Sequence, residues 1–217
     1  TTGRYLKERM PFTFDVDFQT GRYYVQDASS MFIHHVIKHV VKEPVRYLDL
    51  CAAPGGKTTT AISALPADSM VVANEIMPAR ARVLHENIVK WGSPRCIVTN
   101  NAPCDLGKLH HFFDVVATDV PCSGEGMMRK DEEARNQWTP VLVKQCATLQ
   151  KSIIADIWQA LRPGGVLIYS TCTYNREENE EMVAHIVEQY GAESVEIPVE
   201  ADWHIHPAID SPHHCYR

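Results

Sequence analysis

Long apolar runs are absent from this sequence of 217 residues. None approaches the roughly 20 residues that a membrane-spanning helix needs. There is no C-x-x-C pair, and the histidines at 204, 206, 213 and 214 are irregularly spaced, so neither pattern indicates a zinc site. The seven cysteines are scattered and odd in number, which excludes a disulfide framework and indicates a reducing compartment. We therefore predict a cytoplasmic globular protein with no membrane partner and no metal.

An excess of positive charge is also missing, since the net charge is −6 at pH 7. A nucleic-acid binder normally carries a basic surface. Basic residues are only locally enriched here, at Arg4, Lys7, Arg9 and Arg22 and again at Arg129-Lys130. From charge alone, ordinary solvated surface is the preferred interpretation of these groups, although Arg129 and Lys130 suit contacts to RNA phosphate equally well. Charge alone therefore does not indicate a nucleic-acid partner.

Strand-like and helix-like segments alternate after a polar, aromatic stretch at residues 1–26, which we interpret as an extended arm or a hairpin around Thr20-Gly21. Apolar runs predict strands at 45–50, 70–75, 95–98, 113–119, 166–171 and 194–199. Helical spacing predicts helices at 27–42, capped by Asp27, at 57–65, 78–91 and 139–162, and at 175–190, capped by Asn175 with Glu178. Such alternation predicts an α/β fold, a doubly wound and mostly parallel sheet with right-handed crossovers.

A glycine-containing loop follows the first predicted strand and precedes a helix. A phosphate-binding P-loop requires a glycine where this chain has Cys51, and Pro54 removes an N–H that such a loop would use. The G-x-G-x-x-G of a dinucleotide fold is absent. An S-adenosylmethionine site is the third interpretation, because Glu75 at the end of the second strand can accept hydrogen bonds from ribose hydroxyls. We rank the methyl donor first, a nucleotide triphosphate second, and a helix-packing turn as the structural alternative.

Two cysteines each follow a predicted strand, Cys122 in D-V-P-C-S-G and Cys172 in S-T-C-T-Y. In an open parallel sheet, ligands bind at the carboxyl ends of the strands. If the two strands are neighbours, about 4.8 Å apart, both thiols reach one crevice. A lone cysteine is more often a small buried apolar residue. Two cysteines at strand ends indicate chemistry with a sulfur nucleophile.

These segments, together with the loop at 51–57, the G-R-Y-Y-V-Q-D-A-S-S-M run at 21–31 and N-R-E-E-N-E at 175–180, resemble the Sun/Fmu family of RNA (cytosine-5) methyltransferases. Within that family the chain is most similar to bacterial enzymes that act on small-subunit ribosomal RNA. The resemblance implies a Rossmann-like class I methyltransferase with strand order around 3-2-1-4-5. It implies that residues 27–217 form the catalytic domain without its final antiparallel strand, and that residues 1–26 end a preceding RNA-binding segment.

The resemblance also implies the roles of individual residues. Cys172 is the expected nucleophile, Cys122 the cysteine that assists product release, Asp119 the acid between methyl donor and base, and Lys57 the lysine of the donor loop. An Asn stands at 101 where the family often has Asp for the adenine, although its carbonyl can still accept from an amino group. The expected contacts to S-adenosylmethionine are Cys51, Ala52, Ala53, Pro54, Gly55, Gly56, Lys57, Glu75, Asn101 and Asp119.

This chemistry has a physical reason for each residue type. Carbon 5 of cytosine is a weak nucleophile, and thiolate addition at carbon 6 activates it by dividing one hard step into two. An acid near ring atom N3 stabilises the charge that develops there. The expected partner is RNA, and the resemblance implies ribosomal RNA or a ribosomal subunit. The alternatives are a DNA cytosine methyltransferase that uses Cys122, a small-molecule methyltransferase, and a non-catalytic RNA-binding or ribosome-assembly module that retains the fold.

Overall fold

The computed structural model describes residues 3–8 and 10–217. Contacts between residues group the chain into two compact units. The first unit comprises Thr1–Asp119 with Ile157–Ile168, and the second comprises Val120–Asp156 with Tyr169–Arg217. Each unit is described below by itself.

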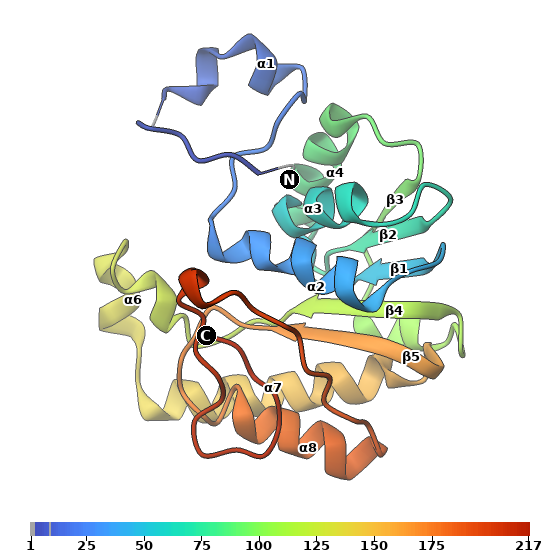
Figure 1. The fold of residues 1–217 in the computed structure, drawn as a ribbon, viewed down its shortest axis with the longest axis vertical. Helices are drawn as coiled ribbons and strands as arrows, with labels where there is room; N and C mark the ends of the chain where they lie inside the picture. Colours follow the sequence, from blue (N-terminus) through green and yellow to red (C-terminus); the bar gives the residue numbers. More distant parts are fainter. Residues whose placement is uncertain (1–2, 9) are drawn as a thin grey trace. The chain divides into compact units, whose positions relative to one another are not determined.

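A five-stranded sheet has the order β3-β2-β1-β4-β5 (Figure 1). Strand β1 pairs in parallel with β2 and with β4, and β2 pairs in parallel with β3. The predicted fold class and strand order are therefore confirmed. The strands are β1 Arg46–Asp49, β2 Met70–Asn74, β3 Cys96–Thr99, β4 Phe113–Asp119 and β5 Leu161–Ser170.

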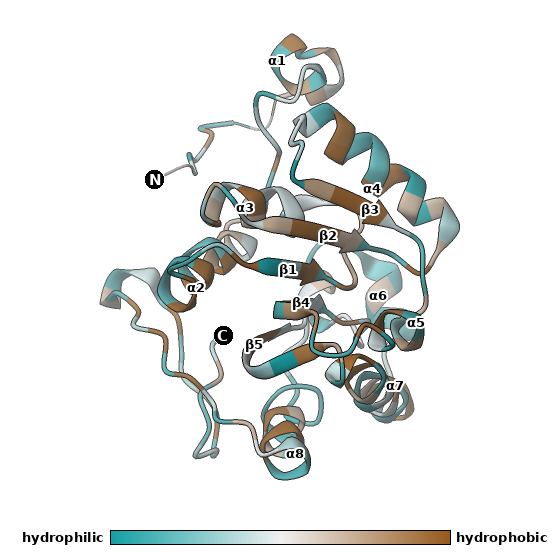
Figure 2. Ribbon diagram, turned by 90° about the vertical axis from the view of Figure 1, so that its right-hand side faces the viewer, coloured by the Kyte–Doolittle hydropathy of each residue, from teal (hydrophilic) through white to brown (hydrophobic). Residues whose placement is uncertain are grey.

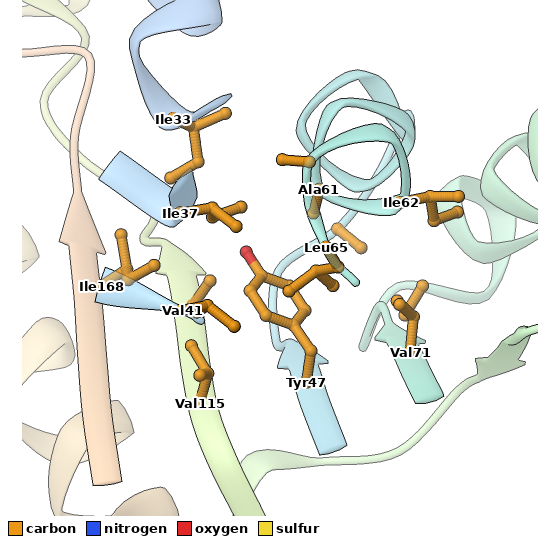
Figure 3. Packing of buried hydrophobic residues seen from close by; sticks show 14 of the residues in the cluster. Ile33, Ile37, Val41, Tyr47, Ala61, Ile62, Leu65, Val71, Val115 and Ile168 are labelled. Atoms are coloured by element: carbon orange, nitrogen blue, oxygen red, sulfur yellow. The ribbon is translucent and has the colours of Figure 1, made fainter. Parts of the chain in front are cut away.

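Helices of the first unit pack on the sheet through apolar side chains. In Figure 2 strand β2 is largely hydrophobic, whereas α4 shows both hydrophobic and hydrophilic positions, as expected of a helix with one exposed side. Tyr47 of β1 is 1% exposed and lies within the buried cluster, with Ile37 of α2 and Leu65 close to its ring (Figure 3). The helices of this unit are α1 Val16–Gln19, α2 Phe32–Val40, α3 Gly56–Ala64, α4 Pro78–Trp91 and α5 Pro103–Gly107.

The second unit contains most of the long helix α7 (Pro140–Trp158), together with η3 (Glu125–Met127), α6 (Glu132–Gln137), α8 (Glu180–Tyr190) and η4 (Ala201–Trp203). Spacings of three and four predict one apolar stripe on this helix, of which four members are buried and Leu149 is not. The stripe is Leu142, Cys146, Leu149, Ile153, Ile157 and Leu161. Leu149 is 47% exposed, whereas Val143, Gln150 and Ile154 are buried. Leu161, expected to end the helix, lies in β5. The buried face therefore includes most of the predicted stripe and is wider than it, and Gln150 takes a buried position in it by making hydrogen bonds.

Several predicted boundaries and elements are wrong. Asp27 does not cap α2, which begins at Phe32 after the 3-10 turn η2 (Ser29–Met31). Residues 1–26 contain η1 (Phe12–Phe14) and α1 rather than a hairpin, since the Asp15 carboxylate caps α1. Asn175 and Glu178 bond reciprocally but close a turn that precedes α8. Residues 194–199 form no strand, because Ile197 N–H donates to the Tyr216 hydroxyl instead of to a neighbouring strand.

Within the described part of the chain, the structure has no helix that combines the length and the apolar character needed to cross a membrane.

Candidate functional site

The two predicted thiols meet in the second unit. Cys122 follows the end of β4 by three residues, and Cys172 follows the end of β5 by two. Their Sγ atoms lie 3.2 Å apart, and neither cysteine is in a disulfide. The backbone N–H of Cys172 also points at Cys122 Sγ, at 3.3 Å. Cys172 is exposed and Cys122 is half-buried, so Cys172 is the more accessible of the two.

Within this pair, Cys122 is the thiol with the raised pKa. The hydrogen bond with Cys172, and then burial, raise the pKa of the Cys122 thiol above its ordinary value. A thiol that keeps its proton can donate a hydrogen bond to the other sulfur. Such a bond stabilises the thiolate form of Cys172. A thiolate, not a thiol, is the nucleophile in cysteine chemistry.

The glycine loop of the first unit is held at the carboxyl ends of β1 and β2. Ala52 N–H donates to Asn74 O at 2.8 Å, and the Asn74 side chain donates to Leu50 O at 3.1 Å. Asn74 is 1% exposed and also exchanges hydrogen bonds with the Asn101 backbone, through its Nδ2 at 3.0 Å and its Oδ1 at 2.9 Å. Sequence reasoning missed Asn74, since a polar residue at a strand end gives no sign of which loops it joins.

Glu75 provides the test of whether this loop fits a ribose-containing ligand. Its side chain is 2% exposed, and Oε1 accepts from Met77 N–H at 3.0 Å. Among the described residues, Oε2 receives no hydrogen bond, although Arg80 Nη1 lies 3.5 Å away. A buried carboxylate oxygen without a donor is costly, and a ligand hydroxyl would satisfy it. The Glu75 carboxylate is therefore an acceptor that fits the hydroxyl groups of a ribose.

Lys57 and Asp119 form an ion pair in the same unit. Lys57 Nζ lies 2.7 Å from Asp119 Oδ2, and the side chains are 30% and 33% exposed. Lys57 belongs to the first turn of α3, and Asp119 ends β4. The two residues that the sequence predicted as lysine and acid of one site are therefore in contact. The ion pair with Lys57 can hold the Asp119 carboxylate in a fixed position.

Asp49 is a buried acid that sequence reasoning did not assign. It is 3% exposed and accepts from Thr58 Oγ1 at 2.6 Å. Burial raises the pKa of Asp49 from 3.8 to about 6, against the effect of the Thr58 hydrogen bond. Burial also raises the pKa of Cys51, to about 11, so this thiol of the loop stays protonated. Cys51 therefore serves packing rather than nucleophilic chemistry.

Aromatic and basic side chains near the cysteine loops and in the N-terminal segment differ in their surroundings. Trp138 Nε1 donates to Glu125 Oε1 at 3.1 Å, while the Tyr174 side chain is 60% exposed. Arg129 and Lys130 are exposed, and Arg22 pairs with Asp17 at 3.3 Å. Arg9 lies outside the described residues. In the described ranges no three or more His, Cys, Asp or Glu side chains are grouped so that they could hold a metal ion, the histidines near the end of the chain included.

The family model for 16S rRNA methyltransferase RsmB/F matches residues 38–211. The chain belongs to this family. The match contains the glycine loop, Glu75, both cysteines and the Lys57–Asp119 pair. The resemblance to the Sun/Fmu methyltransferases is thus confirmed at the level of the family.

Curated relatives of the RsmB/F chain include ribosomal RNA small subunit methyltransferase F of Escherichia coli O7:K1, which is 37% identical over 185 residues. That alignment covers 85% of this chain and 39% of the relative. The protein of the same name from Vibrio parahaemolyticus is 39% identical over 183 residues, covering 84% of this chain and 38% of its own length. The chain therefore spans about two fifths of the length of these relatives.

Solved structures agree with the fold. NSun6 from Pyrococcus horikoshii with SFG is 28% identical, with a TM-score of 0.77 over 90% of this chain and 49% of the other. A methyltransferase homolog protein from the same organism is also 28% identical, with a TM-score of 0.78 over 94% of this chain and 62% of the other. The order of the sheet and the family assignment therefore have independent support.

Proposed function

We propose that this chain is the catalytic part of an S-adenosylmethionine-dependent methyltransferase that modifies carbon 5 of a cytosine in RNA. The substrate is ribosomal RNA of the small subunit, as the names of the relatives suggest. The observation that carries the proposal is the approach of Cys122 and Cys172 to 3.2 Å between sulfur atoms. A methyltransferase for small molecules needs neither thiol, and a non-catalytic module has no use for the pair.

The donor side of the site uses residues of the first unit. When bound, S-adenosylmethionine supplies an electrophilic methyl group on a sulfonium sulfur. Glu75 Oε2 accepts from the ribose hydroxyls, and the loop at 51–57 provides backbone groups at the start of α3. Asn101, held by Asn74, is available to the adenine. These assignments follow from unsatisfied or accessible groups on the loop and at the ends of β2 and β3.

The nucleophile is Cys172. Its thiolate, stabilised by the Cys122 S–H, adds to carbon 6 of the cytosine, and electron density moves to carbon 5. Asp119, held by Lys57, assists at ring atom N3, where charge develops. Once carbon 5 carries the methyl group, its proton passes to solvent, and the electron pair of that C–H bond re-forms the double bond between carbons 5 and 6 as the Cys172 sulfur departs. Cys122 donates a hydrogen bond to that sulfur as its bond to carbon breaks.

The raised pKa of Cys122 supports the choice of Cys172 as the nucleophile. A DNA cytosine methyltransferase would use the cysteine that follows proline, which here is Cys122. Its thiol keeps the proton and is half-buried, so it is the poorer nucleophile of the pair. The exposed Cys172 is the better candidate.

Variants of the two cysteines test the proposal. Incubation with small-subunit rRNA and radiolabelled methyl donor should give labelled RNA with the original protein and none with Cys172→Ala. Cys122→Ala should instead accumulate a covalent RNA–protein adduct, seen as a slowly migrating species in a denaturing gel. Bisulfite sequencing of the labelled RNA should locate a modified cytosine.

Opposite behaviour would reverse the assignment. If Cys172→Ala still transfers methyl groups while Cys122→Ala does not, Cys122 is the nucleophile. If the original protein binds the methyl donor in calorimetry but labels no RNA, the non-catalytic alternative is favoured.

A further inference from the structure

Two glutamates connect the loop that carries Cys122 with the loop that carries Cys172, one from each loop. Glu125 comes three residues after Cys122, and its carboxylate reaches the segment that carries Cys172. Glu178 comes six residues after Cys172, and its carboxylate reaches the segment that carries Cys122. All of these residues belong to the second unit. Each loop therefore supplies a carboxylate to the other.

Glu125 binds the backbone that follows Cys172. Its Oε2 accepts from Tyr174 N–H at 2.6 Å, Asn175 N–H at 2.8 Å and Thr173 Oγ1 at 2.7 Å. Burial would raise the pKa of Glu125, but these hydrogen bonds outweigh it and hold the pKa below its ordinary value. The side chain is therefore an ionised acceptor that three donors of one loop surround.

Glu178 binds the residue that follows Cys122. Its side chain is fully buried, and both of its oxygens lie near Ser123 N–H, at 3.1 and 3.3 Å. Gln150 Nε2 of α7 donates to Oε2 at 2.7 Å, and Asn175 Nδ2 donates to Oε1 at 2.8 Å. Gln150 Nε2 also lies 2.9 Å from Pro121 O, so α7 fixes both sides of this contact.

Direct contacts between the loops close the arrangement. Ser123 Oγ and Thr173 Oγ1, both buried, lie 3.0 Å apart, and Asn175 Nδ2 donates to each of them. Gly126 N–H donates to Cys172 O at 2.7 Å. Ser123 and Thr173, which directly follow the two cysteines, are thus hydrogen-bonded to each other. Ser123 also binds Glu178, and Thr173 binds Glu125.

We propose that Glu125 and Glu178 are positioning residues that form a reciprocal carboxylate clamp, which holds the two sulfurs within hydrogen-bond distance. Their role in methyl transfer rests on the proposed function, because they act through Cys122 and Cys172 and touch no substrate. The role in holding the sulfurs together does not depend on that function. Displacements of about 1 Å at a reacting group can cost about 100-fold in rate. A clamp of this kind is therefore relevant to catalysis.

Isosteric variants remove the clamp with little change in volume. In Glu178→Gln an amide NH2 replaces one of two oxygens that both accept hydrogen bonds, so a donor faces a donor. In Glu125→Gln the amide NH2 faces a donor in either orientation, the Trp138 Nε1–H or the donors of the Cys172 loop. Thr173→Val removes one hydroxyl of the clamp at similar size, and Thr173→Ser restores it. The matched control is Glu177→Gln, the same charge change at the exposed residue beside Glu178.

The first measurement needs no RNA and no methyl donor. Diamide oxidises two neighbouring thiols to a disulfide and takes up their two hydrogens, and mass spectrometry of peptides reports the Cys122–Cys172 link. The original protein and Glu177→Gln should link rapidly. Glu125→Gln, Glu178→Gln and Thr173→Val should link about 10-fold more slowly, and Thr173→Ser should regain most of the rate. Linking at the original rate in all three clamp variants would overturn the proposal.

The second measurement is single-turnover methyl transfer. We expect Glu125→Gln and Thr173→Val to lower the rate about 10- to 100-fold while the donor Kd stays within about twofold. If these variants instead raise KM for RNA about 10- to 100-fold and leave the rate at saturating RNA unchanged, the positioning role is contradicted. If Glu178→Gln does not fold, as circular dichroism would show, Glu125→Gln and Thr173→Val still decide the question. If the original protein transfers no methyl group, the proposed function fails, while the diamide series still tests the clamp.

Discussion

At the scale of single residues, the buried Asp49 and the half-buried Glu125 have different surroundings and different consequences. Asp49 has one short hydrogen bond, from Thr58, and burial raises the pKa of Asp49 to about 6. Glu125 has four donors around its two oxygens, and these lower the pKa of Glu125 despite burial. The number of donors, rather than burial alone, decides in which protonation state an acid is stable.

Replacing Asp49 by Asn should therefore have an effect on stability that depends on pH. The folded pKa lies above the unfolded value of about 3.8, so the folded state binds the proton more tightly between about 4 and 6. The stability that Asp49 contributes is fully present below about 4 and is lost as the pH rises through about 6. In urea unfolding, the free energy of unfolding of the original protein minus that of Asp49→Asn should fall by up to about 3 kcal/mol over this range and then level off. A difference that does not change with pH would contradict the raised pKa.

At the scale of elements, Gly92 and Gly126 are required for two different reasons. Gly92 follows α4 with φ of 74°, a left-handed conformation, and a Cβ there would meet nothing within 4 Å. Gly126 lies in η3, and a Cβ there would lie 2.6 Å from Cys172 O. The first glycine is needed for its backbone angles, and the second for the close approach of the two cysteine loops.

Alanine at these two positions should separate the two effects. Gly126→Ala forces the Cys172 backbone away and should cost about 1–3 kcal/mol of stability, as overpacking does. Combined with Cys122→Ala, which lets the adduct accumulate, Gly126→Ala should also slow adduct formation on Cys172. Gly92→Ala should cost about 1 kcal/mol through its backbone angles and leave adduct formation unchanged. Thermal unfolding and the adduct gel report the two quantities, and equal adduct rates in both variants would contradict a role for the close approach.

At the scale of the whole molecule, an acidic chain belongs to a family named for its action on RNA. The net charge of −6 opposes binding to a polyanion, and the exposed Arg129 and Lys130 offer only local attraction. Contacts with phosphate release counterions, which makes the affinity depend on salt concentration. Few contacts mean a low affinity.

Binding of single-stranded RNA by this chain should therefore be weak and strongly dependent on salt. We expect the logarithm of the association constant to fall with the logarithm of salt concentration with a slope of about −2, which corresponds to about three phosphate contacts. Arg129→Gln should reduce that slope by about 0.7, whereas Lys151→Gln, on the exposed side of α7, should not change it. Fluorescence anisotropy at several salt concentrations measures this, and tight binding that ignores salt would refute the prediction.

Local sequence signals determined much of the fold. Helix α4, with Pro78 at its start and Gly92 after its end, and strand β4, Phe113–Asp119, have the predicted bounds, because proline, glycine and apolar runs act over a few residues. The short helices α5 and α6 were missed because they have too few residues to show periodicity. The predicted strand at 194–199 is absent because a strand requires a paired neighbour, and pairing is not encoded in the segment itself.

The candidate site, like the fold, was predicted in part from the sequence and decided in part by the tertiary structure. Its residue types and their order along the chain were sufficient to indicate a sulfur nucleophile, a second thiol and a donor loop, since each stands directly after a strand. Only the tertiary structure decided that Glu125 and Glu178 bind each other's loops, that Asn74 holds Asn101, and that the contact with Cys172 raises the pKa of Cys122. Hydrogen-bond partners and burial depend on which segments meet in space, and no spacing along the chain specifies that.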